Sequence, residues 1–321
     1  MADMLGEPVA DWQQASCFLN GEWGALRDAK VSVLDRGFIF GDGVYEVIAV
    51  DVFKGTAGTF QAPFRALEHF LRLQRSLDAV RIVNPLTNEQ WFDLTAEVIE
   101  RNPWPRQLVY VQVTRGIAKR DHPFPVGVRP TVFVSTSPWP AIPGEQIELG
   151  VTAVTHADER WLHCDIKSTS LLGNVLMKQY AIDQGASETV MVRDGFLTEG
   201  SSTNISVVKN GVVSMPPKTV HILPGITIDG IGGIALEHGI PTEVRPVPAA
   251  ELRDADEIWL SSSGREVLAV VSLDGVPVGS GKPGPMYCSM HKWFQQAKRV
   301  DAEQWALQRV QRSPTTDAHT K

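Results

Sequence analysis

The sequence predicts an α/β protein of the α+β kind with two domains. Its 321 residues exceed the usual length of one domain. Apolar residues follow the strand period in some stretches and the helix period in others. They alternate as in a strand at residues 107–114 and recur at helical spacing at residues 64–77. Residues 138–144 contain three prolines and a glycine, a composition typical of a linker. Together these observations predict two mixed domains joined at that stretch.

The predicted boundaries follow from the linker. We expect a small N-terminal domain over residues 1–137, in which residues 1–16 form an extension before the first strand. The linker covers residues 138–144, and a larger C-terminal domain covers residues 145–321. Apolar residues at helical spacing predict a final helix over residues 290–312.

Turn signals and periodicity predict the elements of the first domain. Asn20-Gly21 favours a tight hairpin turn between Phe18 and Trp23. Pro63 suits the start of a helix over residues 64–77. The same two periodicities predict strands over residues 31–34, 107–114 and 129–135, and a helix over residues 89–100.

Similar signals predict the elements of the second domain. Leu172, Val175 and Leu176 recur at helical spacing, and Gly185 suits the position just past the helix end. Asp194-Gly195 predicts another tight turn. The remaining patterns predict strands over residues 147–154, 188–192, 196–199, 205–208 and 212–213, and a helix that opens at residues 223–227 and closes at Gly239.

Composition excludes several classes of function. The chain is 43% hydrophobic and 21% charged, as in ordinary soluble proteins, and its net charge of −7 disfavours nucleic acid as a partner. No apolar run is long enough to span a bilayer, and residues 1–7 lack the pattern of a signal peptide. Three separated cysteines suit a reducing compartment, and the histidines lack the spacing of metal ligands. We therefore expect a cytoplasmic protein without a metal site.

Two motifs point to a function. Residues 165–168 read Asp-Ile-Lys-Ser and residues 198–204 read Thr-Glu-Gly-Ser-Ser-Thr-Asn. Local patterns put Lys167 at a strand end before a helix, and Glu199 at a strand end before a turn. Together with Leu-Leu-Gly-Asn at residues 171–174, the motifs resemble the active-site core of the fold-type IV transaminases, which use pyridoxal 5′-phosphate (PLP).

The resemblance implies a fold and two central roles. The family has a small N-terminal α/β domain and a larger C-terminal domain with a β-barrel-like sheet, and the cofactor lies between them. Its lysine, here Lys167, forms a Schiff base with PLP, which requires a desolvated neutral amine. Its glutamate, here Glu199, pairs with the pyridine nitrogen and keeps the ring an electron acceptor.

Further cofactor contacts are implied residue by residue. Arg72 lies in the family's His-x-x-Arg-Leu context and would bind the phosphate, for which a guanidinium offers parallel donors. Gly-Ile-Thr at residues 225–227 would bind the same phosphate at a helix N-terminus. The implied cofactor-binding set is Lys167, Glu199, Arg72, Ser202, Asn204, Ile226, Thr227, Ser262 and Ser263. Gly264 departs from a common threonine, and Arg265 beside it is either an extra substrate-binding charge or an exposed side chain.

The implied substrate contacts come from two other motifs. Residues 35–46 carry an Asp-Arg-Gly and Phe-Gly-Asp-Gly-Val-Tyr-Glu signature of the family, in which Tyr45 helps to hold the substrate carboxylate. Arg120 and His122 resemble the Arg-x-His carboxylate trap of D-amino acid transaminases, whose loop reaches into the partner subunit's site. A homodimer is therefore implied, and Asp121 must point away from the bound anion.

The resemblance covers about residues 18–300 and implies a transaminase. The expected reaction moves the amino group of D-amino acids such as D-alanine to 2-oxo acids such as 2-oxoglutarate by a ping-pong mechanism, with Lys167 as general base and acid. Three alternatives share the fold: a branched-chain L-amino acid transaminase, which the Arg-x-His pair disfavours, an (R)-selective amine transaminase, and an aminodeoxychorismate lyase. A catalytically silent binding protein is opposed by the presence of both Lys167 and Glu199.

Overall fold

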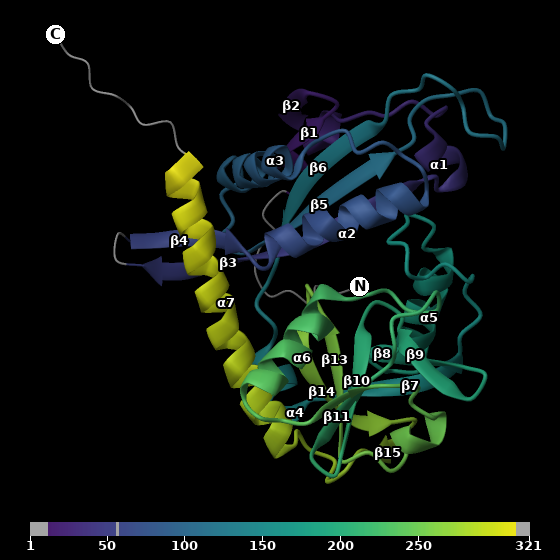
Figure 1. Ribbon diagram of the computed structural model, residues 1–321, viewed down its shortest axis with the longest axis vertical. Helices are drawn as coiled ribbons and strands as arrows, with labels where there is room; N and C mark the ends of the chain where they lie inside the picture. The colour runs from purple at the N-terminus through teal and green to yellow at the C-terminus, as the bar shows by residue number, and fades with distance from the viewer. Residues whose placement is uncertain (1–11, 56–57, 313–321) are drawn as a thin grey trace.

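The computed structural model describes residues 12–55 and 58–312, which fold around two sheets (Figure 1). One sheet is built from the N-terminal part of the chain and the other from the C-terminal part, and they lie one above the other in this view. No helix in the described ranges is long and apolar enough to cross a membrane. The predicted extension falls mostly on residues 1–11, outside the described residues.

The first sheet has six strands in the order β2-β1-β6-β5-β3-β4, and every neighbouring pair is antiparallel. The hairpin at Asn20-Gly21 and the strand at residues 107–114 are confirmed. Val109, Val111 and Val113 alternate into the core, as strand periodicity requires. The strands are β1 (Ser16–Leu19), β2 (Glu22–Ala25), β3 (Gly43–Gly55), β4 (Gly58–Pro63), β5 (Gln107–Thr114) and β6 (Thr131–Pro138).

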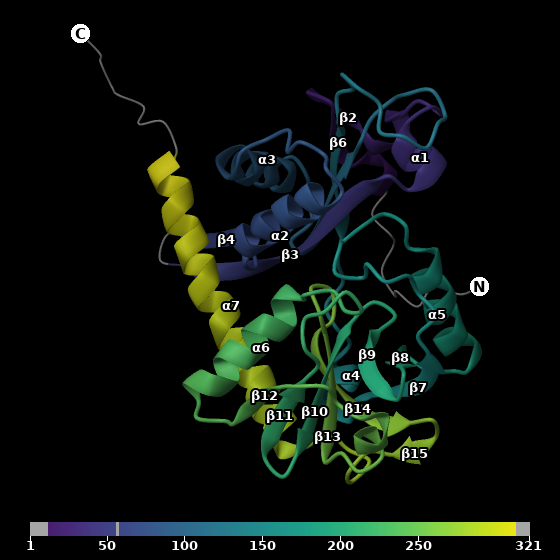
Figure 2. The ribbon, with the colours of Figure 1, turned by 45° about the vertical axis from the view of Figure 1, so that its right-hand side comes forward.

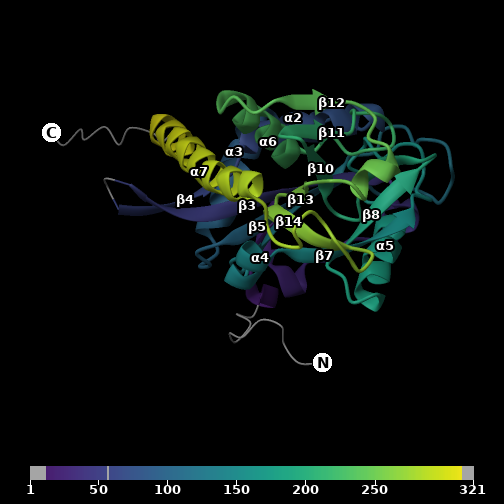
Figure 3. The ribbon, with the colours of Figure 1, turned by 90° about the horizontal axis from the view of Figure 1, so that it is seen from below.

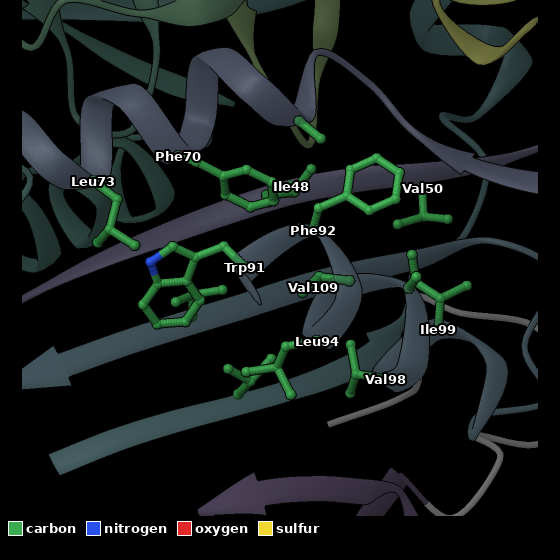
Figure 4. Packing of buried hydrophobic residues seen from close by; sticks show 14 of the residues in the cluster. Ile48, Val50, Phe70, Leu73, Trp91, Phe92, Leu94, Val98, Ile99 and Val109 are labelled. Carbon is green, nitrogen blue, oxygen red and sulfur yellow. The ribbon is translucent and has the colours of Figure 1, made fainter. Parts of the chain in front are cut away.

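Two helices pack against this sheet, and a one-turn helix, α1 (Arg36–Phe40), precedes β3. The helices α2 (Ala66–Ala79) and α3 (Asn88–Glu100) confirm the two predicted helices. Thr87 and Gln90 form a reciprocal capping box that fixes the start of α3. Figure 4 shows side chains of α2 and α3 packed against those of β3 and β5 in one apolar core.

The second sheet has nine strands, in the order β12-β11-β10-β13-β14-β7-β8-β9 with β15 beside β14. Its β7 pairs in parallel with both β8 and β14, and the three neighbours β13, β14 and β7 are seen from below in Figure 3. The strands are β7 (Val151–Ala157), β8 (Glu188–Arg193), β9 (Phe196–Gly200), β10 (Asn204–Lys209), β11 (Val212–Met215), β12 (Thr242–Val244), β13 (Glu257–Ser262), β14 (Glu266–Leu273) and β15 (Val276–Pro277). The helices here are α4 (Gly144–Leu149), α5 (Leu172–Asp183) and α6 (Ile226–Glu237).

Two predicted strands differ from the structure. Residues 31–34 form no strand. Val31, Val33 and Leu34 are exposed, so the apolar alternation here does not mark a strand with one face buried in a sheet. The strand predicted over residues 147–154 begins only at Val151, because its first residues belong to α4. Gly150, with φ of 77°, separates the helix from the strand at a backbone angle that favours glycine.

The last helix, α7 (Pro285–Arg312), starts before the predicted position and runs beside both sheets (Figures 1 and 2). Its first half contributes Tyr287 and Phe294 to a core of the second sheet. Its second half contributes Ala302 and Trp305 to the core of the first sheet. One helix therefore contacts both halves of the chain, and the predicted domain limits stay a prediction.

We predict that Trp305→Ala lowers the free energy of unfolding by about 3 to 4 kcal/mol, because it removes a large buried side chain. The Trp305 ring lies 4.0 Å from that of Phe92 and is only 7% exposed. Urea denaturation measures the change. Leu307→Ala on the same helix, where Leu307 is 63% exposed, is the control and should change the value by less than about 0.5 kcal/mol. Equal effects of the two substitutions would contradict this packing.

Candidate active site

A pocket of about 330 Å³ lies where the first sheet, the second sheet and the loops between them meet. It contains most of the predicted site residues, although they come from distant parts of the sequence. The predicted residues that line it are Tyr45, Arg72, Lys167, Glu199, Ser202, Asn204, Ile226, Thr227, Ser262 and Ser263. The structure thus brings together the predicted cofactor-binding set in one cavity.

Lys167 lies in the loop between β7 and α5, not at the end of a strand as predicted. Its backbone is held on two sides: its N–H donates to Ser76 Oγ at 3.2 Å, and its carbonyl accepts from the Tyr45 N–H at 2.9 Å. Its Nζ lies 4.3 Å from the centroid of the Tyr45 ring. The amine therefore faces an aromatic wall of the pocket, which reduces its contact with water.

Glu199 ends in the same pocket from β9, and its carboxylate is buried. One oxygen accepts from Arg160 Nη1 at 2.6 Å. The other accepts from Asn204 Nδ2 and from the Leu223 N–H, each at 3.1 Å. Burial raises the pKa of Glu199 to about 7, although Arg160 acts in the opposite direction. A further cationic partner in the pocket would stabilise the ionised form of this carboxyl group.

Arg160 was not predicted as a site residue, although it lines the pocket and is buried with two carboxylates. It makes paired hydrogen bonds to Asp158, both at 2.9 Å, besides its bond to Glu199. Asp158 also accepts from Thr198 Oγ1 at 2.8 Å. No spacing rule connects Arg160 to Glu199, because β8 and α5 intervene, so the sequence held no signal for this pair.

Arg72 is buried in α2 and has partners from both halves of the chain. Its guanidinium makes two hydrogen bonds with Glu46, at 2.7 and 2.8 Å, and a third to the Pro224 carbonyl at 3.1 Å. His69 lies 2.7 Å from the same carboxylate. Burial alone would raise the pKa of Glu46, but the Arg72 guanidinium holds this pKa well below its usual range.

An anion cradle lies beside Arg72 at the start of α6. Ile226 and Thr227 occupy the first turn of that helix, whose first N–H groups have no acceptor within the helix. A Cβ at Gly225 would collide with Asn204 Oδ1, so only glycine allows the chain to enter α6 this close to the pocket. Ser262 and Ser263 add hydroxyl groups to the cavity. Free donors, hydroxyls and a guanidinium together suit a phosphate group.

The loop with Arg120 and His122 lies outside the pocket of its own chain. Both side chains are exposed, with the Arg120 guanidinium 5.3 Å and the His122 ring 5.6 Å from the ring centroid of Phe40. Arg36 holds the loop by donating to the Asp121 carbonyl at 2.5 Å and to the His122 carbonyl at 3.4 Å. The exposed Asp121 side chain accepts from the His122 N–H at 2.8 Å.

The Asp-Arg-Gly signature therefore has a second purpose that sequence reasoning missed. Arg36 and Arg115 both bond to Asp42, at 2.7 and at 2.8 Å, so the two guanidinium groups share one carboxylate. Arg115 also lies 3.7 Å from the centroid of the Phe124 ring, farther along the same loop. The signature, which lies just before β3, thus fixes the position of the loop that carries Arg120 and His122.

Comparison with known proteins identifies the family. Residues 43–273 match the model of the amino-transferase class IV family. The chain belongs to this family. It is 39% identical over 279 residues to a D-alanine aminotransferase of Staphylococcus aureus (strain MSSA476), covering 87% of this chain and 96% of that one. A D-alanine aminotransferase of Bacillus licheniformis is 38% identical over 267 residues, or 83% of this chain and 91% of that one.

Solved structures with the same fold include two branched-chain amino acid aminotransferases. The Escherichia coli protein is 27% identical with a TM-score of 0.80, over 90% of this chain and 96% of that one. The T.th. protein, complexed with N-(5′-phosphopyridoxyl)-L-glutamate, is 26% identical with a TM-score of 0.82, over 91% of this chain and 97% of that one. The predicted fold-type IV fold and the PLP-dependent aminotransferase class are confirmed.

The raised pKa of Glu199 predicts a pH effect in the cofactor-free protein. Because the folded protein holds the Glu199 proton more tightly than the unfolded chain, this residue destabilises the fold increasingly as the pH rises from about 4.5 to about 7. Glu199→Gln should therefore be more stable than the parent at pH 8, by up to about 3 kcal/mol. At pH 4 the difference should be smaller.

Urea denaturation of both cofactor-free proteins at pH 4 and pH 8 measures this. A stability difference that is the same at both values would show that Glu199 titrates alike in the folded and unfolded chains, contrary to its burial.

Proposed function

We propose that this protein transfers the amino group of D-amino acids, with D-alanine as the test substrate, to 2-oxo acids such as 2-oxoglutarate. The observation that carries the proposal is the anchored loop of Arg120 and His122, which presents two donors for a carboxylate. The named activity of the relatives at 38–39% identity supports the same choice. The fold alone does not discriminate, because the cited solved neighbours are branched-chain enzymes.

The pocket offers a place for each part of the cofactor. Ile226, Thr227 and Arg72 would hold the phosphate, with Ser262 and Ser263 beside it. Glu199 would face the pyridine nitrogen, and Ser202 and Asn204 would complete the wall. When bound, PLP supplies an electron sink for the bond that breaks at the substrate α-carbon. Asn204 would also orient Glu199 through their hydrogen bond.

Lys167 is the residue that would move protons. Its side chain lines the pocket, and Ser76 and Tyr45 hold its backbone through hydrogen bonds, so the side chain enters the pocket from a fixed point. As general base it would take the proton from the substrate α-carbon and, as general acid, deliver it on the same face. Tyr45, which lines the pocket at the amine, would orient the substrate carboxylate.

The proposal requires a homodimer, because Arg120 and His122 do not line the pocket of their own chain. Large apolar side chains are exposed on α1 and α5, two helices that lie on the same side of the molecule (Figure 2). Phe38 in α1 is 70% exposed, and Leu172 and Val175 in α5 are 72% and 58% exposed. Exposed apolar groups in such number mark an interface. We infer that a second copy covers them and brings its own loop to the pocket.

Mixing two inactive variants tests this arrangement. Arg120→Ala should lose activity because the carboxylate trap is incomplete, and Lys167→Ala should lose it because the proton carrier is missing. After unfolding and refolding together in equal amounts, half of the dimers contain one subunit of each kind. If the loop acts in the partner's site, one pocket in each mixed dimer is intact, so about a quarter of the parent activity should return. Activity that stays absent in the mixture would contradict a loop shared between subunits.

The amino donor distinguishes a D-amino acid transaminase from a branched-chain L-amino acid transaminase. The PLP-loaded protein should change its absorbance spectrum on addition of D-alanine and not of L-leucine. A branched-chain enzyme, the alternative favoured by the solved neighbours, would respond to L-leucine alone. A response to neither would move the proposal to (R)-amines or to the lyase reaction. Stopped-flow spectroscopy of the single half-reaction gives the answer without an acceptor.

A further inference from the structure

Four charged side chains meet where α7 contacts both β3 and β14. Lys298 of α7 is 5% exposed and forms ion pairs with Asp51 in β3 and with Glu266 in β14, the latter at 2.6 Å. Arg106, just before β5, lies 2.5 Å from Asp51 and 3.5 Å from Glu266. Two cations and two carboxylates thus form one balanced cluster between the first sheet, the second sheet and the last helix. Each buried charge is stabilised only while its partners stay in place.

Glu266 has a backbone conformation that its residue type disfavours. Its φ is 53°, in the left-handed region that glycine adopts most readily. The residue follows the turn between β13 and β14, and it pairs with Ser262 across that hairpin. Its carboxylate accepts from Lys298 Nζ at 2.6 Å and from Gln295 Nε2 at 2.5 Å, both on α7. These bonds hold the strained residue, since such strain persists only where the surroundings fix it.

The turn beside Glu266 forms part of the pocket wall. Ser262 and Ser263, which begin the turn, both line the pocket. A second tether reaches the turn from Trp139, which is buried and donates from Nε1 to the Gly264 carbonyl at 3.2 Å. The Arg106 guanidinium lies 4.1 Å from the centroid of the Trp139 ring, so the charge cluster also holds this tryptophan. The pocket serines are therefore fixed by groups that do not line the pocket themselves.

We propose that Glu266 and Lys298 are positioning residues for the cofactor, because they hold the turn that places the hydroxyls of Ser262 and Ser263 at the phosphate. The inference rests on the proposed function, in which these serines lie beside the phosphate. Neither Glu266 nor Lys298 lines the pocket, so both act through the turn alone. A glutamate at a position that favours glycine then has a reason, since its carboxylate fixes the turn although its backbone is strained.

The test compares PLP with pyridoxal, its analogue without the phosphate. Equilibrium dialysis gives the Kd of each compound for the cofactor-free parent and for Glu266→Gly and Lys298→Met. The ratio of the pyridoxal Kd to the PLP Kd should fall by about tenfold in each variant, because a displaced serine loses one hydrogen bond to a charged phosphate. The Kd of pyridoxal should stay as in the parent.

The variants separate the carboxylate from general damage to the fold. Glu266→Gly removes the carboxylate without new strain, since glycine accepts the left-handed backbone, and Asp51 still pairs with both cations. Lys292→Met is the matched control, because Lys292 is exposed on α7 and does not line the pocket, so its ratio should equal that of the parent. If Lys298→Met does not fold, as judged by circular dichroism, Glu266→Gly alone decides.

Three results would overturn the proposal. The first is a ratio that is unchanged in the folded variants, and the second is a parent that binds PLP no more tightly than pyridoxal. The third is an equal weakening of both compounds, which would show general damage to the pocket and not a displaced turn. No amino donor enters this measurement, so failure of the parent to react with D-alanine would contradict the proposed function and leave the positioning role to be decided by the ratio.

Discussion

The pocket depends on one buried guanidinium. Arg72 lies in α2, its carboxylate partner Glu46 lies in β3, and its third bond reaches Pro224 just before α6. A buried charge that lost its partner would destabilise the fold by several kcal/mol, so these three segments must keep their relative positions. The phosphate cradle at the start of α6 is therefore positioned from the first sheet as well as from the second.

Other buried charges of the site also depend on partners. Glu199 is buried only in the company of Arg160, Asn204 and a backbone N–H, and even so its proton is held tightly. A bound cationic ring nitrogen would complete its surroundings. Such a nitrogen is the group that PLP would bring to this side of the pocket.

Much of this could be predicted from the sequence, for local reasons. The strand at residues 107–114 and the helix at 89–100 follow from periodicity, and the pocket lining follows from motifs that resemble the family. Periodicity failed at residues 31–34 because it reports an apolar pattern and not whether a neighbouring strand exists. It also could not show that the apolar stripe of α5 is exposed in a single chain. Arg160 was missed because its pairing is set by tertiary structure alone.

The proposed chemistry requires that Lys167 binds PLP covalently in this pocket, where Lys178 is a second lysine on the lining. Borohydride reduction of the PLP-loaded protein fixes the bond, and peptide mass mapping then locates the label. We predict the phosphopyridoxyl label on the peptide with Lys167 and none on the peptide with Lys178. A label on Lys178, or no label on either peptide despite bound PLP, would contradict this assignment.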